Sequence, residues 1–128
     1  MPVAVLTYHS QNICGNTYQT NDHIAFAADL RTLNDAGWEF VSALDVAKHV
    51  VHGAALPQKA VAITMDDGCN FDYFDLPYLD FGVQRSMLNI MRDFKVAHSH
   101  TRTLAHERTA APTCHIVRHC VAYGTPTN

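Results

Sequence analysis

Apolar positions in the first part of the chain switch between strand and helix patterns. Residues 3–9 (VAVLTYH) form a β-branched and aromatic run that predicts a buried strand. After a polar segment, apolar residues recur at helical spacing from Asp22, which we expect to cap a helix, and Gly37 fits the left-handed stop after it. Two further strands are predicted at residues 38–42 (WEFVS) and 60–65 (AVAITM).

A second helix is predicted between the last two of these strands. Ser42 and Asp45 have the spacing of a capping box, and the helix should run to about His52, where Gly53 ends it. Residues 83–94 (VQRSMLNIMRDF) show another helical stripe. The order β-α-β-α-β-loop-α predicts an α/β fold, in which a parallel sheet, open or closed into a barrel, is flanked by helices.

Up to about residue 94, the apolar periodicity, the helix caps and the glycine stops all predict the same strands and helices, and beyond it they do not. Residues 95–113 have no helical or alternating apolar pattern, and residues 114–123 (CHIVRHCVAY) fit one short strand or a helical turn. We therefore divide the chain into an α/β segment, residues 1–94, and an irregular tail, residues 95–128. The first holds 11 acidic and five basic residues, a net charge of −6, and the tail holds one acidic and four basic residues, a net charge of +3. The tail also carries five of the nine histidines.

Composition excludes several classes of protein. A chain of 128 residues has room for one domain at most, and 48% hydrophobic residues exclude wholesale disorder. The net charge of −3 argues against nucleic-acid binding driven by phosphate contacts. No apolar run approaches the roughly 18 residues of a membrane span, and the first residues lack the pattern of a signal peptide, so we expect a cytoplasmic protein by default. The four cysteines have no paired spacing and are expected to be free thiols: Cys14, Cys69, Cys114 and Cys120.

Two adjacent carboxylates follow the third predicted strand, at Asp66 and Asp67. Ligands of parallel α/β folds bind at the carboxyl ends of the strands. Neighbouring strand residues point to opposite sides, and Gly68 allows a bend, so the two carboxylates should differ in role. One could hold a metal while the other acts as a base, or one could cap the next segment while the other is solvated.

The sequence around these carboxylates resembles a known family. Thr64 to Gly68 (TMDDG), after a buried strand, is similar to the Thr-Phe-Asp-Asp-Gly motif of the polysaccharide deacetylase (NodB-homology) family, a group like carbohydrate esterase family 4. The resemblance covers about residues 3–94. Its other matching features, in chain order, are Tyr8-His9, Phe26 to Leu33 followed by Gly37, Leu56-Pro57, and Gln84 to Phe94.

The resemblance implies a fold and a chemistry. The fold would be the incomplete N-terminal portion of a NodB-type distorted (β/α) barrel. Asp66 would be the catalytic base and Asp67 a ligand of a divalent metal, zinc, nickel or cobalt. The reaction would be hydrolysis of the C–N bond of an N-acetylated saccharide in bacterial carbohydrate metabolism, releasing acetate and an amino sugar. His9 would lie near this edge of the sheet, either in a structural role or facing the substrate.

The second motif of the family, His-(Ser/Thr)-x2-His, is not found in its usual form. His115 and His119 are four positions apart, a spacing that would place both imidazoles on one face of a helix. Two cysteines flank this pair. Ile116, however, stands where the family has Ser or Thr, and no apolar strand separates Phe94 from His115. These two histidines are therefore candidate metal ligands of a divergent site.

A shifted reading frame is a second explanation of the tail. Residues 114–123 can be back-translated as TGC CAC ATC GTT CGT CAT TGC GTC GCC TAC, and reading from the second base gives Ala-Thr-Ser-Phe-Val-Ile-Ala-Ser-Pro. This run has the pattern of the buried apolar strand that the family has before its second motif.

Three functions stay open: a metal-dependent deacetylase, an inactive truncated family member, and a small zinc-binding module that uses His115 and His119. Cys69 is also a conceivable nucleophile, and the aromatic cluster at residues 71–78 could stack on sugars or pack in the core.

Overall fold

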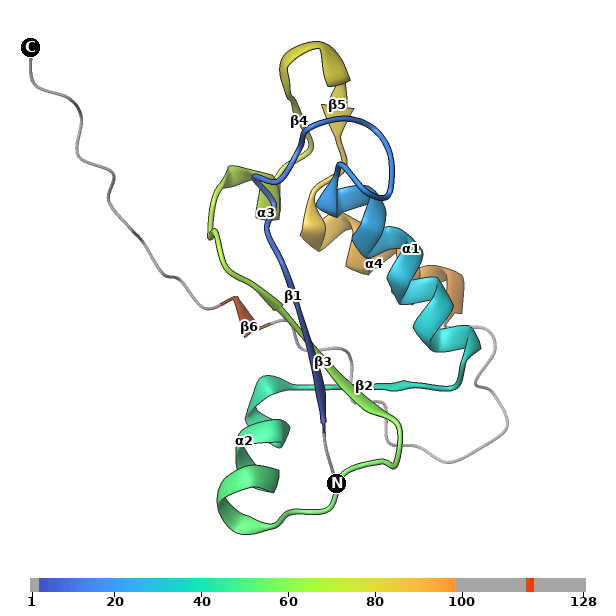
Figure 1. The fold of residues 1–128 in the computed structure, drawn as a ribbon, viewed down its shortest axis with the longest axis vertical. Coiled ribbons are helices and arrows are strands. Elements are labelled where there is room, and N and C mark those ends of the chain that lie inside the picture. The colour runs from blue at the N-terminus through green and yellow to red at the C-terminus, as the bar shows by residue number, and fades with distance from the viewer. Residues whose placement is uncertain (1–2, 99–114, 117–128) are drawn as a thin grey trace, which may run out of the picture.

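The computed structural model describes residues 3–98 and 115–116, which form a mixed α/β fold around a parallel sheet (Figure 1). Strand β3 (Ala60–Met65) is central, with β1 (Ala4–Tyr8) on one side and β2 (Glu39–Val41) on the other. A short strand, β6 (His115–Ile116), also pairs with β3. All of these pairings are parallel, which confirms the α/β class predicted from the sequence.

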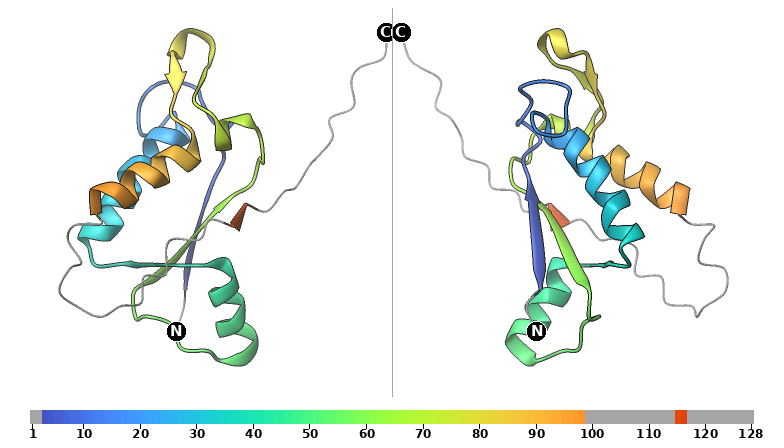
Figure 2. Two further views of the ribbon diagram at one scale, coloured as in Figure 1. Left: turned by 180° about the vertical axis from the view of Figure 1, so that it is seen from behind. Right: turned by 45° about the vertical axis from the view of Figure 1, so that its right-hand side comes forward.

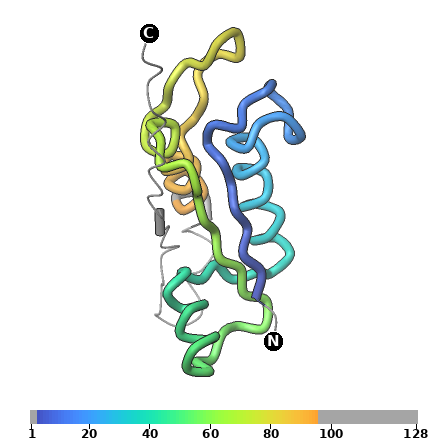
Figure 3. The backbone as a smooth tube through the Cα atoms, turned by 60° about the vertical axis from the view of Figure 1, so that its left-hand side comes forward, coloured from blue at the N-terminus to red at the C-terminus, as the bar shows by residue number. Residues whose placement is uncertain are grey.

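The register of the sheet brings two strand ends together. Ala4 pairs with Val61 and Tyr8 with Met65, so β1 and β3 end side by side (Figure 3). One pair before these ends, the hydroxyl groups of Thr7 and Thr64 form a hydrogen bond of 2.9 Å. Whatever follows Tyr8 and Met65 must therefore meet at one edge of the sheet.

Two helices lie along one face of the sheet (Figure 2). These are α1 (Asp22–Asp35) and α4 (Met87–His98), which pack against each other. Another helix, α2 (Ala43–His52), lies near the start of β1, at the end of the sheet away from Tyr8 and Met65 (Figure 1). The core forms between the sheet and the α1–α4 pair, and its buried members are Tyr8, Ala25, Phe26, Leu30, Val61, Ile63, Met65, Met87 and Ile90.

The observed N-cap of helix α2 is the one predicted from the sequence, whereas the N-cap of helix α1 lies one residue before the predicted one. Helix α2 has the expected capping box, in which Ser42 and Asp45 bond each other's backbone N–H, and Gly53 ends it in the left-handed conformation with φ of 67°. Helix α1 is capped by Asn21 and not by Asp22. The side chain of Asn21 accepts from the His23 N–H, whereas the carboxylate of Asp22 is used by the preceding loop.

The helix predicted over residues 83–94 is shorter at its start and longer at its end. Val83–Gln84 form strand β5, which pairs antiparallel with β4 (Leu76–Pro77) around a 3-10 turn at Leu79–Phe81. Helix α4 begins only after Ser86, whose hydroxyl accepts from the Asn89 N–H. Val83 was expected on the helical stripe but is 69% exposed in the hairpin. A short helix, α3 (Asn70–Tyr73), lies between β3 and this hairpin.

The start of the histidine pair has strand geometry. His115 pairs with Thr64 and Ile116 with Met65, so these two residues adopt the strand and not the helical turn, both of which the sequence left open for residues 114–123. His119 itself lies outside the described residues, as do Cys114 and Cys120. Within residues 3–98 and 115–116, none of the helices is both long and apolar enough to cross a bilayer.

Candidate functional site

His9 and Asp66 face each other where β1 and β3 end. The N–H of Asp66 donates to the Tyr8 carbonyl at 3.3 Å, which continues the strand pairing by one residue. The His9 Nε2 lies 3.4 Å from the Asp66 Oδ2, and the two side chains are 51% and 54% exposed. Asp66 is therefore a solvent-accessible carboxylate that pairs with an imidazole across the strand ends.

Asp67 points into a different environment. Its Oδ2 accepts from the backbone N–H of Gln11 at 2.9 Å, in the loop that follows β1. Gly68, at φ of 60°, turns the chain directly afterwards. The two carboxylates consequently differ, as expected from strand alternation: one faces His9 and solvent, and the other ties the two strand-end loops together.

A buried carboxylate lies beneath this turn. Asp72 is 1% exposed, and within the described part of the chain neither of its oxygens meets hydrogen-bond geometry with a partner. Burial raises the pKa of Asp72, and the hydroxyl of Ser10 lowers it in part, while the charge of Asp67 raises it further. Ser10 is fully buried and contacts the Cys69 thiol at 3.0 Å. The strand-end loops thus rest on a polar cluster in which Ser10 and Asp72 are buried and Cys69 is partly buried.

The loop of residues 10–21 is fixed at both ends. Asp22 accepts from the His9 N–H at 2.7 Å and from the Asn12 side chain at 2.7 Å. His23 is 2% exposed, with one ring nitrogen 2.8 Å from the Ser10 carbonyl and the other 2.6 Å from the Arg85 carbonyl. The imidazole of His23 therefore connects the β1 loop to the segment that enters α4, and Asp22 holds the backbone of His9.

Tyr8 anchors the end of β1 to helix α1. Its hydroxyl donates to the Asp29 Oδ2 at 2.6 Å, and the other oxygen of Asp29 accepts from Tyr18 at 2.8 Å. Burial raises the pKa of Tyr8, and the Asp29 carboxylate raises it further, so the phenol stays protonated and acts as a donor. Tyr8 is thus a structural residue of the site, although it stands next to the exposed His9.

The described residues supply an incomplete set of metal ligands. Carboxylate and imidazole are ligand types that zinc accepts, and Asp67, Asp66 and His9 lie at one edge of the sheet. In the region that the structure describes, however, no group of three His, Cys, Asp or Glu side chains is arranged to hold a metal ion. The register places the backbone of His115 beside Thr64, two residues before Asp66.

The aromatic cluster after the turn divides into an inner and an outer part. Phe71 packs edge-on against Tyr78, with ring centres 5.6 Å apart, and lies 6.0 Å from the ring of His23. Phe74 is 60% exposed. Packing therefore accounts for Phe71, whereas Phe74 presents an aromatic surface to solvent.

Sequence reasoning missed the polar cluster under the turn. Ser10 falls in the polar segment before Asp22, and Asp72 falls in the aromatic cluster at residues 71–78, yet both are buried. A weak signal existed for Asp72, because a single carboxylate between Phe71 and Tyr73 has an apolar neighbour on each side. No sequence feature indicated that Ser10 and Cys69, 59 positions apart, would be in contact.

Comparison with known proteins adds a limited finding. No protein-family model matches the sequence, and no curated protein matches it either. Among solved structures, the chain is similar to a de-N-acetylase from Aggregatibacter actinomycetemcomitans, with 18% sequence identity and a TM-score of 0.42. The match covers 77% of this chain and 51% of the other, so the chain spans about half the length of that enzyme. A likeness at this level does not by itself establish a shared activity.

Proposed function

We propose that this chain carries a deacetylase-like site, which hydrolyses the C–N bond of an N-acetylated saccharide with the help of a divalent metal. The observation that carries the proposal is the position of Asp66 and Asp67, which follow the central strand β3 at the edge where β1 also ends. This edge is where parallel α/β folds bind their ligands.

The two carboxylates are suited to different tasks. Asp66 is half exposed and therefore reachable by water, and His9 at 3.4 Å can orient its carboxylate. Asp67 is held by the Gln11 N–H through one oxygen, which leaves the other oxygen available as a ligand. Zinc, nickel or cobalt bound there would polarise the acetamide carbonyl and lower the pKa of an attacking water.

The experiment measures acetate release and metal content together. The full chain is incubated with N-acetylated chito-oligosaccharides in the presence of zinc, nickel or cobalt. We expect Asp66→Asn to lower the rate of acetate release by about 10²-fold or more while the metal stays bound, since a positioned base contributes that much. Asp67→Asn should lose both metal and activity. Asp80→Asn, in the exposed hairpin, is the matched control and should behave as wild type.

A zinc-binding module is a second candidate, favoured by the pairing of β6 with the end of β3. In that case zinc binds with unit stoichiometry, His115→Ala abolishes binding, and Asp67→Asn leaves it intact. A chain that binds no metal and releases no acetate would contradict both functions and support the inactive family member.

We further propose that the tail comes from a shifted reading frame of a deacetylase-like gene. Strand β6 falls at His115–Ile116, where one permitted back-translation of residues 114–123 reads in its second frame as the apolar run Ala-Thr-Ser-Phe-Val-Ile. Sequencing the source DNA tests this. A strand-coding sequence in the second frame supports the proposal, and its absence from an intact gene contradicts it.

A further inference from the structure

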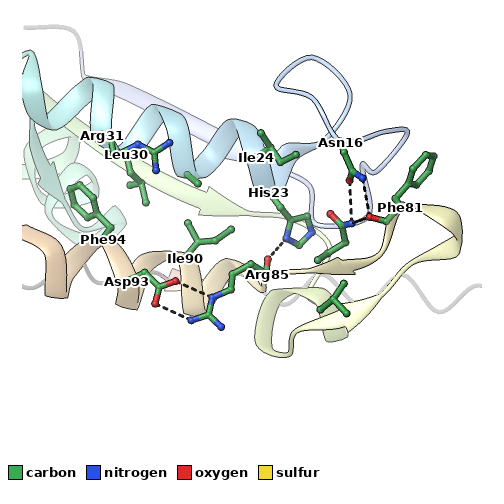
Figure 4. A pocket seen from close by; sticks show the side chains of 13 residues that line it. Asn16, His23, Ile24, Leu30, Arg31, Phe81, Arg85, Ile90, Asp93 and Phe94 are labelled. Atoms are coloured by element: carbon green, nitrogen blue, oxygen red, sulfur yellow. Dashed lines mark hydrogen bonds and ion pairs between the residues drawn. The ribbon is translucent and has the colours of Figure 1, made fainter.

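We propose that the hollow between α1 and α4 binds an amphipathic anion, a carboxylate with an apolar tail. This inference is independent of the proposed hydrolase site. The hollow has a volume of about 610 Å³, within the range of pockets that bind small molecules. It lies between the two helices and the β4–β5 hairpin (Figure 4).

The walls of the hollow are apolar over most of their length. Ile24, Ala27 and Leu30 line it from α1, and Ile90 and Phe94 line it from α4. Leu30 and Ile90 form the floor, at 2% and 7% exposure. Burying an alkyl tail here removes apolar surface from water on both sides, at about 25 cal/mol for each Å².

The polar groups at the inner end are already bonded. His23 contacts the Ser10 and Arg85 carbonyls, and the Gln84 side chain accepts from Asn21 at 2.6 Å. A ligand with many polar groups, such as a sugar, would find few free partners there. The inner end therefore selects for an apolar segment and not for a second polar head.

Among the residues that the structure describes, one cation of the lining has no charged partner. The guanidinium of Arg85 is shared by Asp75 at 2.6 Å and Asp93 at 2.9 Å, so it has no charge left for a ligand, and the three groups together carry a net charge of −1. Arg31, on α1, is exposed and has no ion-pair or hydrogen-bond partner among the residues that the structure describes. A carboxylate head group complements Arg31, and an apolar tail complements the walls next to it.

The test uses the full chain and three ten-carbon probes: decanoate, decanol and decylammonium. Binding is measured by calorimetry, and its location by amide chemical shifts. We expect decanoate to bind with one site and about tenfold more tightly than decanol, the effect of one charge-assisted hydrogen bond, and decylammonium to bind more weakly still. Shifts should cluster on α1 and α4.

Two variants and one control separate the contributions. Arg31→Gln should make decanoate and decanol bind equally, and Ala27→Leu should weaken both by filling the hollow. Arg92→Gln, on α4 outside the lining, should change neither. Equal affinity for decanoate and decanol in the wild-type chain, the same loss in Arg92→Gln as in Arg31→Gln, shifts located elsewhere, or a stable dimer that covers the hollow would each overturn the proposal.

Discussion

Asp75 holds the start of α4, and its removal should destabilise the fold in a pH-dependent way. Its carboxylate accepts from the Ser86 N–H at 2.8 Å, from the Asn89 side chain at 3.0 Å and from Arg85 at 2.6 Å. The Ser86 N–H is the largest cause and Asn89 the next, and together with Arg85 they lower the pKa of Asp75 from 3.8 to about 2. The folded state therefore favours the charged carboxylate.

The size of the effect follows from the pKa values. One pKa unit corresponds to about 1.4 kcal/mol, so the difference between 3.8 and about 2 sets an upper bound of about 2.5 kcal/mol on the contribution of Asp75 to the free energy of unfolding. The Asp75 side chain is 31% exposed, and solvent screening lowers the expected contribution to about 1 kcal/mol. Because the folded pKa is the lower one, this stability is fully present above about pH 4 and is lost as the pH falls through about 2.

The assay is urea unfolding of wild type and Asp75→Asn, followed by the fluorescence of Trp38, which packs against the core. We expect the variant to be less stable by about 1 kcal/mol at pH 6, with about half of this difference left at pH 3. Asp80→Asn, in the same hairpin, should show no such difference. A gap between wild type and Asp75→Asn that stays constant from pH 6 to pH 3 would refute the reasoning.

Substitutions at three further positions test the fold. Phe26→Ala removes a fully buried ring of the core and should cost about 3–5 kcal/mol of unfolding free energy in urea titrations; a loss below about 1 kcal/mol would contradict its placement. Ser42→Ala removes the capping box of α2 and should cost about 1 kcal/mol, whereas Ser42→Thr, which keeps the hydroxyl that donates to Asp45, should restore most of it. Gly53→Ala has open space for its methyl group, so its expected cost of about 1 kcal/mol comes from the φ of 67° alone, and a neutral melting temperature would argue against this conformation.

The strands and helices before the turn at Gly68 could be predicted because each is marked by several local signals. Strand β3 was predicted at its observed bounds, since six apolar or β-branched residues lie between a lysine and two aspartates. The capping box at Ser42 and the glycine stop at Gly53 are equally local. Such features depend on neighbours within a few residues, and the sequence displays them directly.

Features that depend on distant contacts could not be predicted. Val83 fits the helical stripe of α4 by spacing, but Gln84 bonds Asn21, 63 positions away, and the segment becomes a strand instead. The site shows the same division. The Asp66-Asp67 pair is visible in the sequence, whereas the buried Asp72 and its contact with the charge of Asp67 arise from the folding of α3 under the turn.

The central claim is that Asp66 and Asp67 form part of a hydrolase site, and acetate release tests it most directly. The full chain and Asp66→Asn are assayed side by side with an N-acetylated chito-oligosaccharide and zinc. The account predicts zinc-dependent release of acetate that falls by about 10²-fold or more in the variant, with zinc binding unchanged. Equal release by both chains, or no release by the wild-type chain at any divalent metal concentration, would contradict it.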